Sequence, residues 1–516
     1  MPGTDFLGLV PPARERTSWL VAQLRAAVAD GRLPAGSRLP PTRTLAGDLG
    51  VARGVVVEAY RRLADEGLVT ARTGAGTIVA APPPPPAGGP VGGAGQARVA
   101  RPGGPPHPAD AAGGGGGAGA PGASGPAGPA GPAGPAGAGS PTGAAGGFGG
   151  WVGGGGKTVE IDLAPGVPDL AAFPRAAWLR AERAVLGSVT TADLGYGDPR
   201  GNFRLRTELA GWLARMRGLR AGPDELIVVA GVAQSLALLA QTLVARGTRA
   251  VAVEDPGSRG AREELQHWGL TTVPVPVDDH GLVVSGLSTV DTAVVTPAHQ
   301  FPTGVVLAPD RRRALLDWGG LVIEDDYDAE HRYDRAPVPA LHAAAPDRVA
   351  HTGSTSKSLA PGLRLGWLVP PPHLHADLVA AKHASDLGSP ALPQLVLAHL
   401  LATGAYDRHL RLVRTRQRRR RDAVLAALRE HLPAARVAGV AAGLHLVVLL
   451  PDGTDDAAAA AAIRERGVAV QPLSLHRVAP GPPGLVLGYA AHPPDRLHEA
   501  VRRIATAVDP APARSS

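Results

Sequence analysis

A long run of proline, glycine and alanine interrupts this chain and limits how it can fold. Residues 81–157 begin with "APPPPPAGGPVGG", continue through "GGGGGAGAPGASGPAGPAGPAGPAG" and end with "GGFGGWVGGGGK". Almost none of these side chains could form a core, so we predict a disordered linker. The four Gly-Pro-Ala triplets are too few for a collagen triple helix. A flexible segment of this length spans about 50 Å, so the folded regions on either side can lie far apart.

The remaining composition excludes several classes of protein. A length of 516 residues favours two or more domains. The absence of cysteine excludes disulfide bonds and thiol chemistry, and it suits a cytoplasmic protein. There is no signal-peptide pattern, and the most apolar stretch, 437–450, is too short to span a membrane; we expect it to be one buried strand. The formal charge of +7 does not identify a partner.

Residues 1–80 have the size of one small module. Apolar residues at helical spacing and glycine stops predict helices over 17–31, 41–50 and 53–67. Two β-like segments, 68–72 and 76–80, follow and are joined by "TGAG". Three helices and a hairpin indicate a winged helix-turn-helix.

In such a module the second helix of the pair enters the major groove of double-stranded DNA, and its first residues meet the base edges. The tip of the hairpin can touch phosphates or the minor groove. We therefore expect DNA contacts at the start of the last two helices and at the hairpin tip, from Arg43, Arg53, Gly54, Arg72, Thr73 and Gly74.

After the linker, residues 158–516 alternate strand-like runs with helical stretches. The strand-like runs are "ELIVVAG", "AVAVED", "TAVVTP", "LVIEDD" and "RVAHTGS". This alternation predicts an α/β domain with a mostly parallel sheet and helices on both faces. Several strands end in polar clusters, which is where such sheets bind ligands.

One lysine in this region stands out against the rest of the chain. The 52 basic residues comprise 49 arginines and three lysines, Lys157, Lys357 and Lys382. Only a primary amine can condense with an aldehyde, whereas a guanidinium stays protonated. A chain that otherwise uses arginine must therefore keep lysine where an imine is required, although the other two lysines carry no such signal.

The surroundings of Lys357 strengthen this interpretation. Ser354, Ser356 and Arg364 offer donors of the kind that hold a phosphate dianion. Asp325, at the end of "IEDD", could pair with a pyridinium nitrogen, and Tyr327 could lie near a phenolate oxygen. A strand, a glycine turn and a helix could aim two backbone N–H groups at an anion, those of Val232 and Ala233. A lysine, a carboxylate and a group of phosphate-binding donors together match the chemical groups of pyridoxal 5'-phosphate.

Both folded regions resemble known families. "GRLPAGSRLPPTRTLAGDLGVARGVVVEAYRRLADEGLVTARTGAGTIV" is similar to the winged helices of GntR-type regulators, which implies DNA contacts at Arg43, Arg53 and the wing from Arg72. "DLGYGDPRG", "AGVAQSLALL", "VEDPGSRGA", "TPAHQFPTG", "IEDDYDAEHRY" and "STSKSLAPGLRLGW" resemble the fold-type I aminotransferases, which depend on pyridoxal phosphate. Joined, the two resemble the MocR/GabR subfamily of transcription regulators.

The aminotransferase resemblance also implies a role for individual residues. Lys357 would form the Schiff base with the cofactor, Asp325 would hold the ring nitrogen, and Tyr196 would reach the phosphate from the partner subunit of a homodimer. Tyr327 with His299 or Gln300 would hold the ring hydroxyl side. The phosphate would be held by Ser354, Ser356 and Arg364.

The chain departs from these families at four positions. Ala52 and Gly54 stand where polar residues are common in GntR winged helices, which bears on base readout. Ser258 replaces an aromatic residue that stacks on the cofactor ring. Val486 stands where aminotransferases carry the arginine that grips the substrate carboxylate. Arg477 or Arg200 are candidates to replace that arginine.

Three functions fit these observations. The first is a regulator that binds DNA and senses pyridoxal phosphate, or an adduct of it with an amine, to control vitamin B6 or amine metabolism. The second is an active aminotransferase with a DNA-tethering head, and the third is a cofactor-free binding module. None of the three requires a metal or a membrane.

Overall fold

The computed structural model of the chain describes residues 11–12, 15–29, 33, 36–66, 68–72, 76–80, 159–333, 338–439 and 442–508. The predicted linker, 81–157, lies outside the described residues. So do Thr73 and Gly74 at the predicted hairpin tip, and Arg72 is described only for its backbone.

The amino-terminal module has the three helices and the hairpin predicted from the sequence. In chain order its elements are α1 (Arg16–Ala29), α2 (Thr42–Asp48), α3 (Arg53–Asp65), β1 (Val69–Arg72) and β2 (Gly76–Val79). Helices α1 and α2 both pack on α3, with Leu20, Leu45 and Leu63 fully buried. Gly50 turns the chain between α2 and α3 at φ = 60°, which glycine adopts at little cost. The antiparallel β1–β2 hairpin forms the wing.

A large, mostly parallel sheet organises the carboxyl-terminal region. Its strands, in spatial order, are β4 (Ile227–Val229), β11 (Gly366–Val369), β10 (Val349–Ser354), β9 (Leu321–Asp326), β8 (Thr292–Val295), β5 (Ala250–Asp255), β6 (Thr271–Asp278) and β7 (Gly281–Leu282). The strands from β10 to β6 pair in parallel, whereas β11 and β7 run antiparallel to their neighbours. The five predicted strand segments correspond to β4, β5, β8, β9 and β10.

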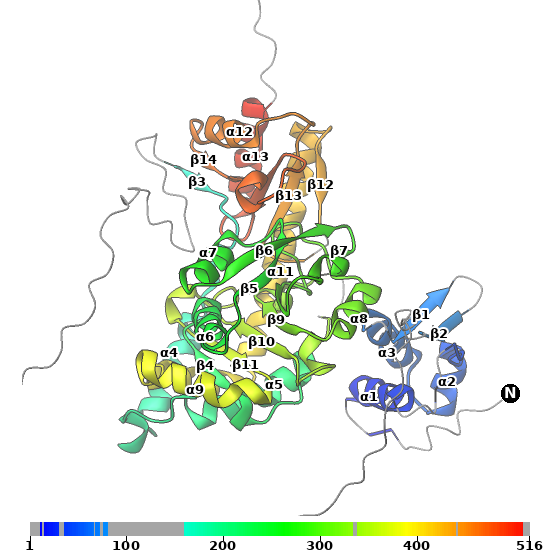
Figure 1. Cartoon of the computed structure of the whole chain (residues 1–516). Coiled ribbons are helices and arrows are strands. Elements are labelled where there is room, and N and C mark those ends of the chain that lie inside the picture. The colour runs from blue at the N-terminus through cyan, green and yellow to red at the C-terminus, as the bar shows by residue number, and fades with distance from the viewer. Residues whose placement is uncertain are drawn as a thin grey trace, which may run out of the picture. The chain divides into compact units, whose positions relative to one another are not determined.

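Helices cover both faces of this sheet, as predicted (Figure 1). They are α4 (Arg175–Leu186), α5 (Phe203–Arg217), α6 (Val232–Ala245), α7 (Arg259–His267), α8 (Pro309–Asp317), α9 (Pro372–Asp386) and α10 (Ala391–Ala402). Successive residues of a strand point to opposite faces. Val251 and Val253 of β5 therefore pack with α6, α7 and α9, while Ala252 packs with α8 on the other face. Helices α5 and α10 bury the β4 and β11 side chains on that second face.

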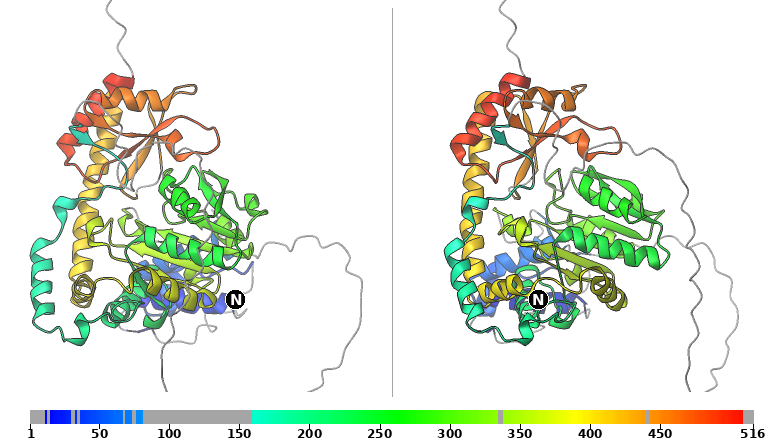
Figure 2. Two further views of the ribbon diagram at one scale, coloured as in Figure 1. Left: turned by 60° about the vertical axis from the view of Figure 1, so that its left-hand side comes forward. Right: turned by 90° about the vertical axis from the view of Figure 1, so that its left-hand side faces the viewer.

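A smaller antiparallel sheet follows in the chain. Its spatial order is β12 (Arg436–Ala438), β13 (His445–Leu449), β16 (Gly484–Gly488) and β15 (Gln471–Pro472), and β3 (Ile161–Asp162) pairs separately with β14 (Val468–Ala469). Three further helices belong to this part, α11 (Ala405–His431), α12 (Asp456–Arg464) and α13 (Pro494–Val508). The long helix α11 runs from the helices beside the large sheet to the small sheet (Figure 2).

The expectation of one buried strand over 437–450 is wrong. The run is divided between β12, which is partly exposed, and β13, which pairs antiparallel to it. Gly439 and Gly443 adopt φ of 99° and 75°, so the chain turns there instead of continuing as a strand. Within the described part of the chain, no helix has the length and apolarity needed to cross a bilayer.

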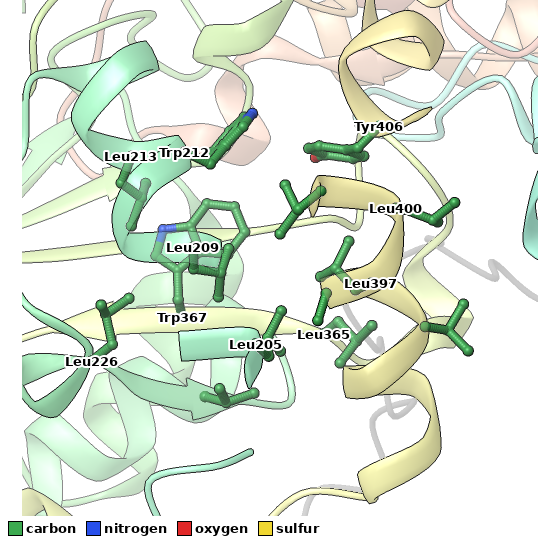
Figure 3. Packing of buried hydrophobic residues seen from close by; sticks show 14 of the residues in the cluster. Leu205, Leu209, Trp212, Leu213, Leu226, Leu365, Trp367, Leu397, Leu400 and Tyr406 are labelled. Carbon is green, nitrogen blue, oxygen red and sulfur yellow. The ribbon is translucent and has the colours of Figure 1, made fainter. Parts of the chain in front are cut away.

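An aromatic cluster joins the large sheet to the helices on its second face (Figure 3). Trp212 of α5 lies with its ring centroid 5.7 Å from Trp367 of β11 and 5.5 Å from Tyr406 of α11. All three side chains are at least 98% buried, and Trp212 Nε1 donates to Asp407 Oδ1 at 3.0 Å. The polar ends of Trp212 and Tyr406 are thus hydrogen-bonded inside an apolar core. Tyr406 also reaches the loop that carries Lys357.

Candidate active site

The predicted site residues come from chain segments that meet at one edge of the large sheet. Strands β4, β9 and β10 run in the same direction, so their carboxyl ends share this edge. Strand β11 runs the opposite way and therefore begins there. Lys357 and Arg364 both lie in the loop between β10 and β11.

Lys357 lies partly buried, with its amine at the centre of the site. Its Nζ donates a hydrogen bond of 2.6 Å to the carbonyl oxygen of Gly166. Burial lowers the pKa of Lys357, and the nearby carboxyls of Asp328 and Asp325 oppose that shift. A lower pKa increases the fraction of neutral, nucleophilic amine.

Gly166 was not predicted as a site residue. It adopts φ = 87°, and a Cβ there would lie 3.1 Å from Lys357 Nζ. Glycine thus lets the backbone of this segment approach the amine. The Pro-Gly pair in "LAPGVPDL" signals a turn but says nothing about a contact 191 residues along the chain.

Asp325 is partly buried, and one of its carboxyl oxygens, Oδ1, is buried without a hydrogen-bond partner among the described residues. Burial raises the pKa of Asp325 to about 8, and the neighbouring Asp326 and Asp328 add to the shift, while Lys357 opposes it. A buried carboxyl oxygen without a partner carries a free-energy cost that a cationic ring nitrogen would relieve. The residue therefore fits the pyridinium end of pyridoxal phosphate.

His299 and Gln300 lie in different surroundings. His299 Nδ1 is 3.0 Å from Tyr327 Oη and 2.8 Å from Asp328 Oδ2, so these three groups form one buried cluster. Burial raises the pKa of Tyr327 well above its usual value, with Asp328 and Asp325 contributing. Gln300 Nε2 instead donates to Glu254 Oε2 and to two backbone carbonyls, and its Oε1 accepts from Thr303. The geometry brings His299, and not Gln300, to Tyr327.

Donor groups converge at the other end of the site. Helix α6 begins after Gly231, which has φ = 99°, and the first N–H groups of a helix, here those of Val232 and Ala233, have no intrahelical acceptor. A Cβ at Gly231 would lie 3.5 Å from Arg364 Nη1, so the guanidinium lies against this helix start. Such an arrangement suits a phosphate dianion.

The two serines among the predicted phosphate-binding donors lie on the same loop as Lys357. Ser354 is the last residue of β10 and is 95% buried. The backbone N–H of Ser356 donates to Ser354 Oγ at 3.4 Å. The two serines thus lie three residues and one residue before Lys357, on the segment that also leads to Arg364.

Ser358, the residue after Lys357, is held in place by side chains of helix α11. Ser358 Oγ lies 2.7 Å from Tyr406 Oη, and His409 Nε2 lies 2.7 Å from the Ser358 carbonyl oxygen. Ser358 is 97% buried. These contacts anchor the backbone beside Lys357 to the aromatic cluster of Figure 3. They were not predicted, because a single sequence gives no sign of which helix packs on the loop.

Ser258 and Val486, two of the departures from the family patterns, each have a structural role. Ser258 caps α7, accepting a hydrogen bond from the Ala261 N–H at 3.2 Å, and so contributes to the helix start. Val486 is fully buried in β16, where it packs with Val447 and Leu473. Position 486 is therefore part of an apolar core.

The two candidate replacement arginines differ. The guanidinium of Arg200 donates to both oxygens of Asp198 and to Asp224, so its charge is already matched. Arg477 Nε is buried without a hydrogen-bond partner in the described residues. The adjacent His476 packs edge-on against Phe301, which in turn packs against Tyr327. Arg477 is the better placed of the two to meet an anionic group.

The predicted residue Tyr196 and the lysine Lys382 have different surroundings. Tyr196 is 87% exposed, and it makes none of the contacts described for the cofactor residues. Lys382, one of the three lysines, is fully buried and donates to both oxygens of Asp386 at 2.6 and 2.5 Å. An ion pair four residues apart on α9, between the buried Lys382 and the exposed Asp386, accounts for this lysine without any imine.

In the amino-terminal module, the predicted DNA contacts on the helices are accessible. Arg43, Arg53 and Gly54 are all exposed, at the starts of α2 and α3. Arg53 Nε donates to Thr42 Oγ1 at 3.4 Å, which links the two helix starts. Val57, one turn further along α3, is also 45% exposed.

Comparisons with known proteins agree with the fold. Residues 158–504 match the family described as aminotransferase class I and II, and residues 17–79 match the bacterial regulatory proteins of the gntR family. The chain is 33% identical over 497 residues to the HTH-type pyridoxine biosynthesis transcriptional regulator PdxR of Corynebacterium glutamicum, covering 95% of each. It is 31% identical over 501 residues to the probable rhizopine catabolism regulatory protein MocR of Rhizobium meliloti, covering 95% of this chain and 92% of the relative.

Solved structures match the carboxyl-terminal region. Kynurenine aminotransferase of Pyrococcus horikoshii in complex with PMP has a TM-score of 0.63 at 27% identity, over 69% of this chain and 91% of that one. An archaeal alanine:glyoxylate aminotransferase has a TM-score of 0.64 at 26% identity, over 69% and 92%. The chain therefore belongs to the MocR subfamily of GntR-type transcription regulators, which join a winged helix-turn-helix to a fold-type I aminotransferase-like domain for pyridoxal phosphate.

Proposed function

We propose that this protein regulates transcription by binding DNA through its winged helix and by sensing pyridoxal phosphate, or an adduct of it with an amine. One contrast in the site carries this proposal. The groups that suit the cofactor surround Lys357, whereas the position for a substrate-binding arginine is a fully buried valine, Val486. A site that keeps the cofactor but lacks the usual carboxylate anchor is better suited to sensing than to turnover.

Each residue of the site has a proposed role toward the cofactor. When bound, pyridoxal phosphate supplies an aldehyde that an amine can attack and a ring that withdraws electrons. Lys357 provides the attacking amine, and Asp325 holds the proton on the ring nitrogen. Tyr327 and His299 border the ring oxygen. The phosphate is held by Ser354, Ser356, Arg364 and the first N–H groups of α6, at Val232 and Ala233.

We further propose that the protein acts as a homodimer. Leu194, Tyr196 and Phe203 are 60%, 87% and 58% exposed within one short segment. Large apolar side chains gathered in this way are typical of a surface that a partner covers. A partner's Tyr196 could then reach the phosphate. Two copies of the winged helix could bind half-sites about 34 Å, or a multiple of it, apart.

DNA binding is assigned to the exposed start of α3 and its surroundings. Arg53 and Gly54 would meet the base edges, and Arg43 a phosphate, while the wing would contribute Arg72, Thr73 and Gly74. Because Ala52 and Gly54 offer no polar side chain, Arg53 would carry most of the hydrogen-bonded base readout.

The regulated process that we favour is the supply of vitamin B6, with amine metabolism as the alternative. One relative is named a regulator of pyridoxine biosynthesis. The loss of the carboxylate-binding arginine also favours the cofactor itself over an amino acid as effector. A ligand shifts a conformational equilibrium only by its difference in affinity for the two states, so a sensor needs binding and no turnover.

An active aminotransferase remains the second candidate, because Lys357 and Asp325 are both retained. It requires steady conversion of an amino donor and a 2-oxo acid. The measurement is product formation over many turnovers with saturating pyridoxal phosphate. More than one product molecule per chain supports the enzyme, and a yield that stops at one or below supports the sensor.

The sensor is tested by DNA binding to the region upstream of the protein's own gene, with and without pyridoxal phosphate. Lys357→Ala and Lys357→Arg are compared with Lys157→Arg, which makes the same substitution at a lysine with no assigned role. The cofactor should change the affinity or the footprint of the native protein and of Lys157→Arg, and leave the two Lys357 variants unchanged. A native protein indifferent to the cofactor would refute the proposal.

A further inference from the structure

A cluster of three metal-ligand side chains lies away from the cofactor site. Glu430 and His431 end helix α11, and His498 lies in the first turns of α13. One oxygen or ring nitrogen from each residue lies within 4.8 Å of the other two. Helices α11 and α13 pack side by side along this stretch (Figure 2).

The separations among these atoms suit a small tetrahedral ion. His498 Nε2 is 3.1 Å from Glu430 Oε2, and His431 Nε2 is 3.7 Å from Glu430 Oε1. Zinc bound to nitrogen and oxygen at about 2.0–2.2 Å places its ligand atoms roughly 3.3–3.5 Å apart in a tetrahedron. The two distances run to different oxygens of Glu430 and fall on either side of that value, and all three ligand atoms lie within 4.8 Å of one another, so side-chain rotations would have to bring them together around an ion.

A simple ion pair explains only part of the cluster. The contact between Glu430 and His498 is an ordinary hydrogen bond, and the imidazoles hold the pKa of Glu430 below its usual value. His431 Nε2, however, is buried and has no hydrogen-bond partner among the described residues. The His431 and His498 rings meet edge to face, with centroids 4.8 Å apart. A buried imidazole nitrogen without a partner beside a second imidazole and a carboxylate is the arrangement that a metal ion completes.

Charges of both signs surround the cluster, since Arg429 stands next to Glu430 in the last turn of α11. The carboxyl end of α11 carries the negative end of the helix dipole, and both Glu430 and His431 lie in its last turn. On α13, Arg496 donates to the backbone carbonyl oxygen of Glu160, and Arg502 and Arg503, further along the helix, are paired with Glu499. Their charge is thus partly neutralised.

We propose that Glu430, His431 and His498 bind one divalent transition-metal ion of the zinc class, with water in the fourth position. Two imidazoles and one carboxylate are a ligand set typical of zinc, and the water position leaves the coordination open. The ion would link the end of α11 to the start of α13, beside the apolar contacts of Leu428 with Leu497 and Val501.

This site is independent of the cofactor. His409 contacts the Lys357 loop from the same helix, 22 residues before His431. At 1.5 Å per residue this corresponds to about 33 Å along the helix axis. Metal binding should therefore leave the absorption of bound pyridoxal phosphate unchanged, so the failure of either proposal does not affect the other.

The test uses the untagged, full-length protein loaded with pyridoxal phosphate and then treated with a chelator. Zinc is titrated by calorimetry into the native protein, His431→Gln, His498→Gln and His383→Gln, the last replacing an exposed histidine on α9. The native protein and His383→Gln should bind one zinc per chain and melt several degrees higher with it. The two site variants should bind at least 10-fold more weakly and show no such shift.

A second measurement guards against effects on folding. Cobalt in place of zinc should give the intense visible absorption of a tetrahedral site in the native protein and in His383→Gln, and should not do so in the site variants. The proposal is overturned if the native protein binds no more zinc than His498→Gln. It is also overturned if cobalt gives the same spectrum in all four proteins.

Discussion

Replacing Asp325 by asparagine should raise the folding stability of the cofactor-free protein at alkaline pH and lower its affinity for pyridoxal phosphate. Asparagine has nearly the shape of a protonated aspartic acid but cannot ionise. The native carboxyl is partly buried, with Oδ1 unpartnered among the described residues, and its pKa is about 8. Ionisation of Asp325 in the empty site is therefore costly, whereas with a ring nitrogen present the same charge is useful.

The size of the effect follows from the pKa. An unfolded aspartate titrates near 3.8 and the folded one near 8, so between these values the folded state holds a proton that the unfolded state has lost. Stability from this group is complete below about pH 4 and is lost as pH rises toward 8, at up to about 1.4 kcal/mol per pH unit. Asp325→Asn removes this slope. At pH 8 the cofactor-free variant should exceed the native protein by several kcal/mol, on the order of 2–5.

The effect on cofactor binding has the opposite sign. A hydrogen bond to a charged group contributes about 1.5–3 kcal/mol, so the variant should bind pyridoxal phosphate about 10- to 100-fold more weakly. The assay is urea unfolding of the cofactor-free proteins from pH 5 to 8.5, followed by tryptophan fluorescence, together with a cofactor titration. The reasoning is refuted if both proteins show the same pH slope, or if the variant binds the cofactor as tightly as the native protein.

Three further predictions concern other parts of the chain. Val486→Arg should not restore substrate binding but should destabilise the domain by more than about 4 kcal/mol, because the guanidinium would enter a fully buried apolar cluster; Val478→Arg, at a 57% exposed position, should be nearly neutral in the same thermal melt. Tyr406→Phe leaves Ser358 Oγ without its 2.7 Å partner and should cost about 1–3 kcal/mol in urea unfolding, with faster loss of bound cofactor on dialysis. Arg53→Ala should weaken binding to operator DNA. If the Arg53 side chain contacts a phosphate instead of a base, the substitution should also lower the salt dependence of the DNA affinity by about one ion. Titrations at several salt concentrations distinguish the two cases.

Much of the fold could be predicted because local patterns agree with the final structure. The runs "LVIEDD" and "AVAVED" begin with three and four consecutive apolar residues, as expected of strands covered on both faces, and glycine marks most helix ends. The exception, 437–450, failed for a local reason. Its apolar residues are continuous, but Gly439 and Gly443 take positive φ and turn the chain back, and hydrophobicity alone does not reveal a turn.

The site was less accessible to sequence reasoning, because its contacts join distant segments. Gly166 meets Lys357 across 191 residues, and Tyr406 meets Ser358 across 48. Gln300 and His299 are adjacent in the sequence, yet the backbone directs one to Glu254 and the other to Tyr327. Lys382 is different, since its partner Asp386 lies four residues later, and helical spacing alone predicts that pair.

The retained and replaced residues together suggest how a catalytic site becomes a sensor. In the proposed roles, Lys357 and Asp325 contact the cofactor itself, so losing either would weaken its binding. By the sequence resemblance, Val486 and Ser258 stand at the positions that bind the substrate carboxylate and stack on the ring in aminotransferases. In this structure Val486 packs in an apolar core and Ser258 caps a helix. Losing the arginine that binds the substrate carboxylate lowers turnover. The affinity for the cofactor then depends largely on the phosphate-binding donors and on the lysine. Occupancy of such a site would follow the concentration of the cofactor and not that of an amino acid, which is what control of vitamin B6 supply requires.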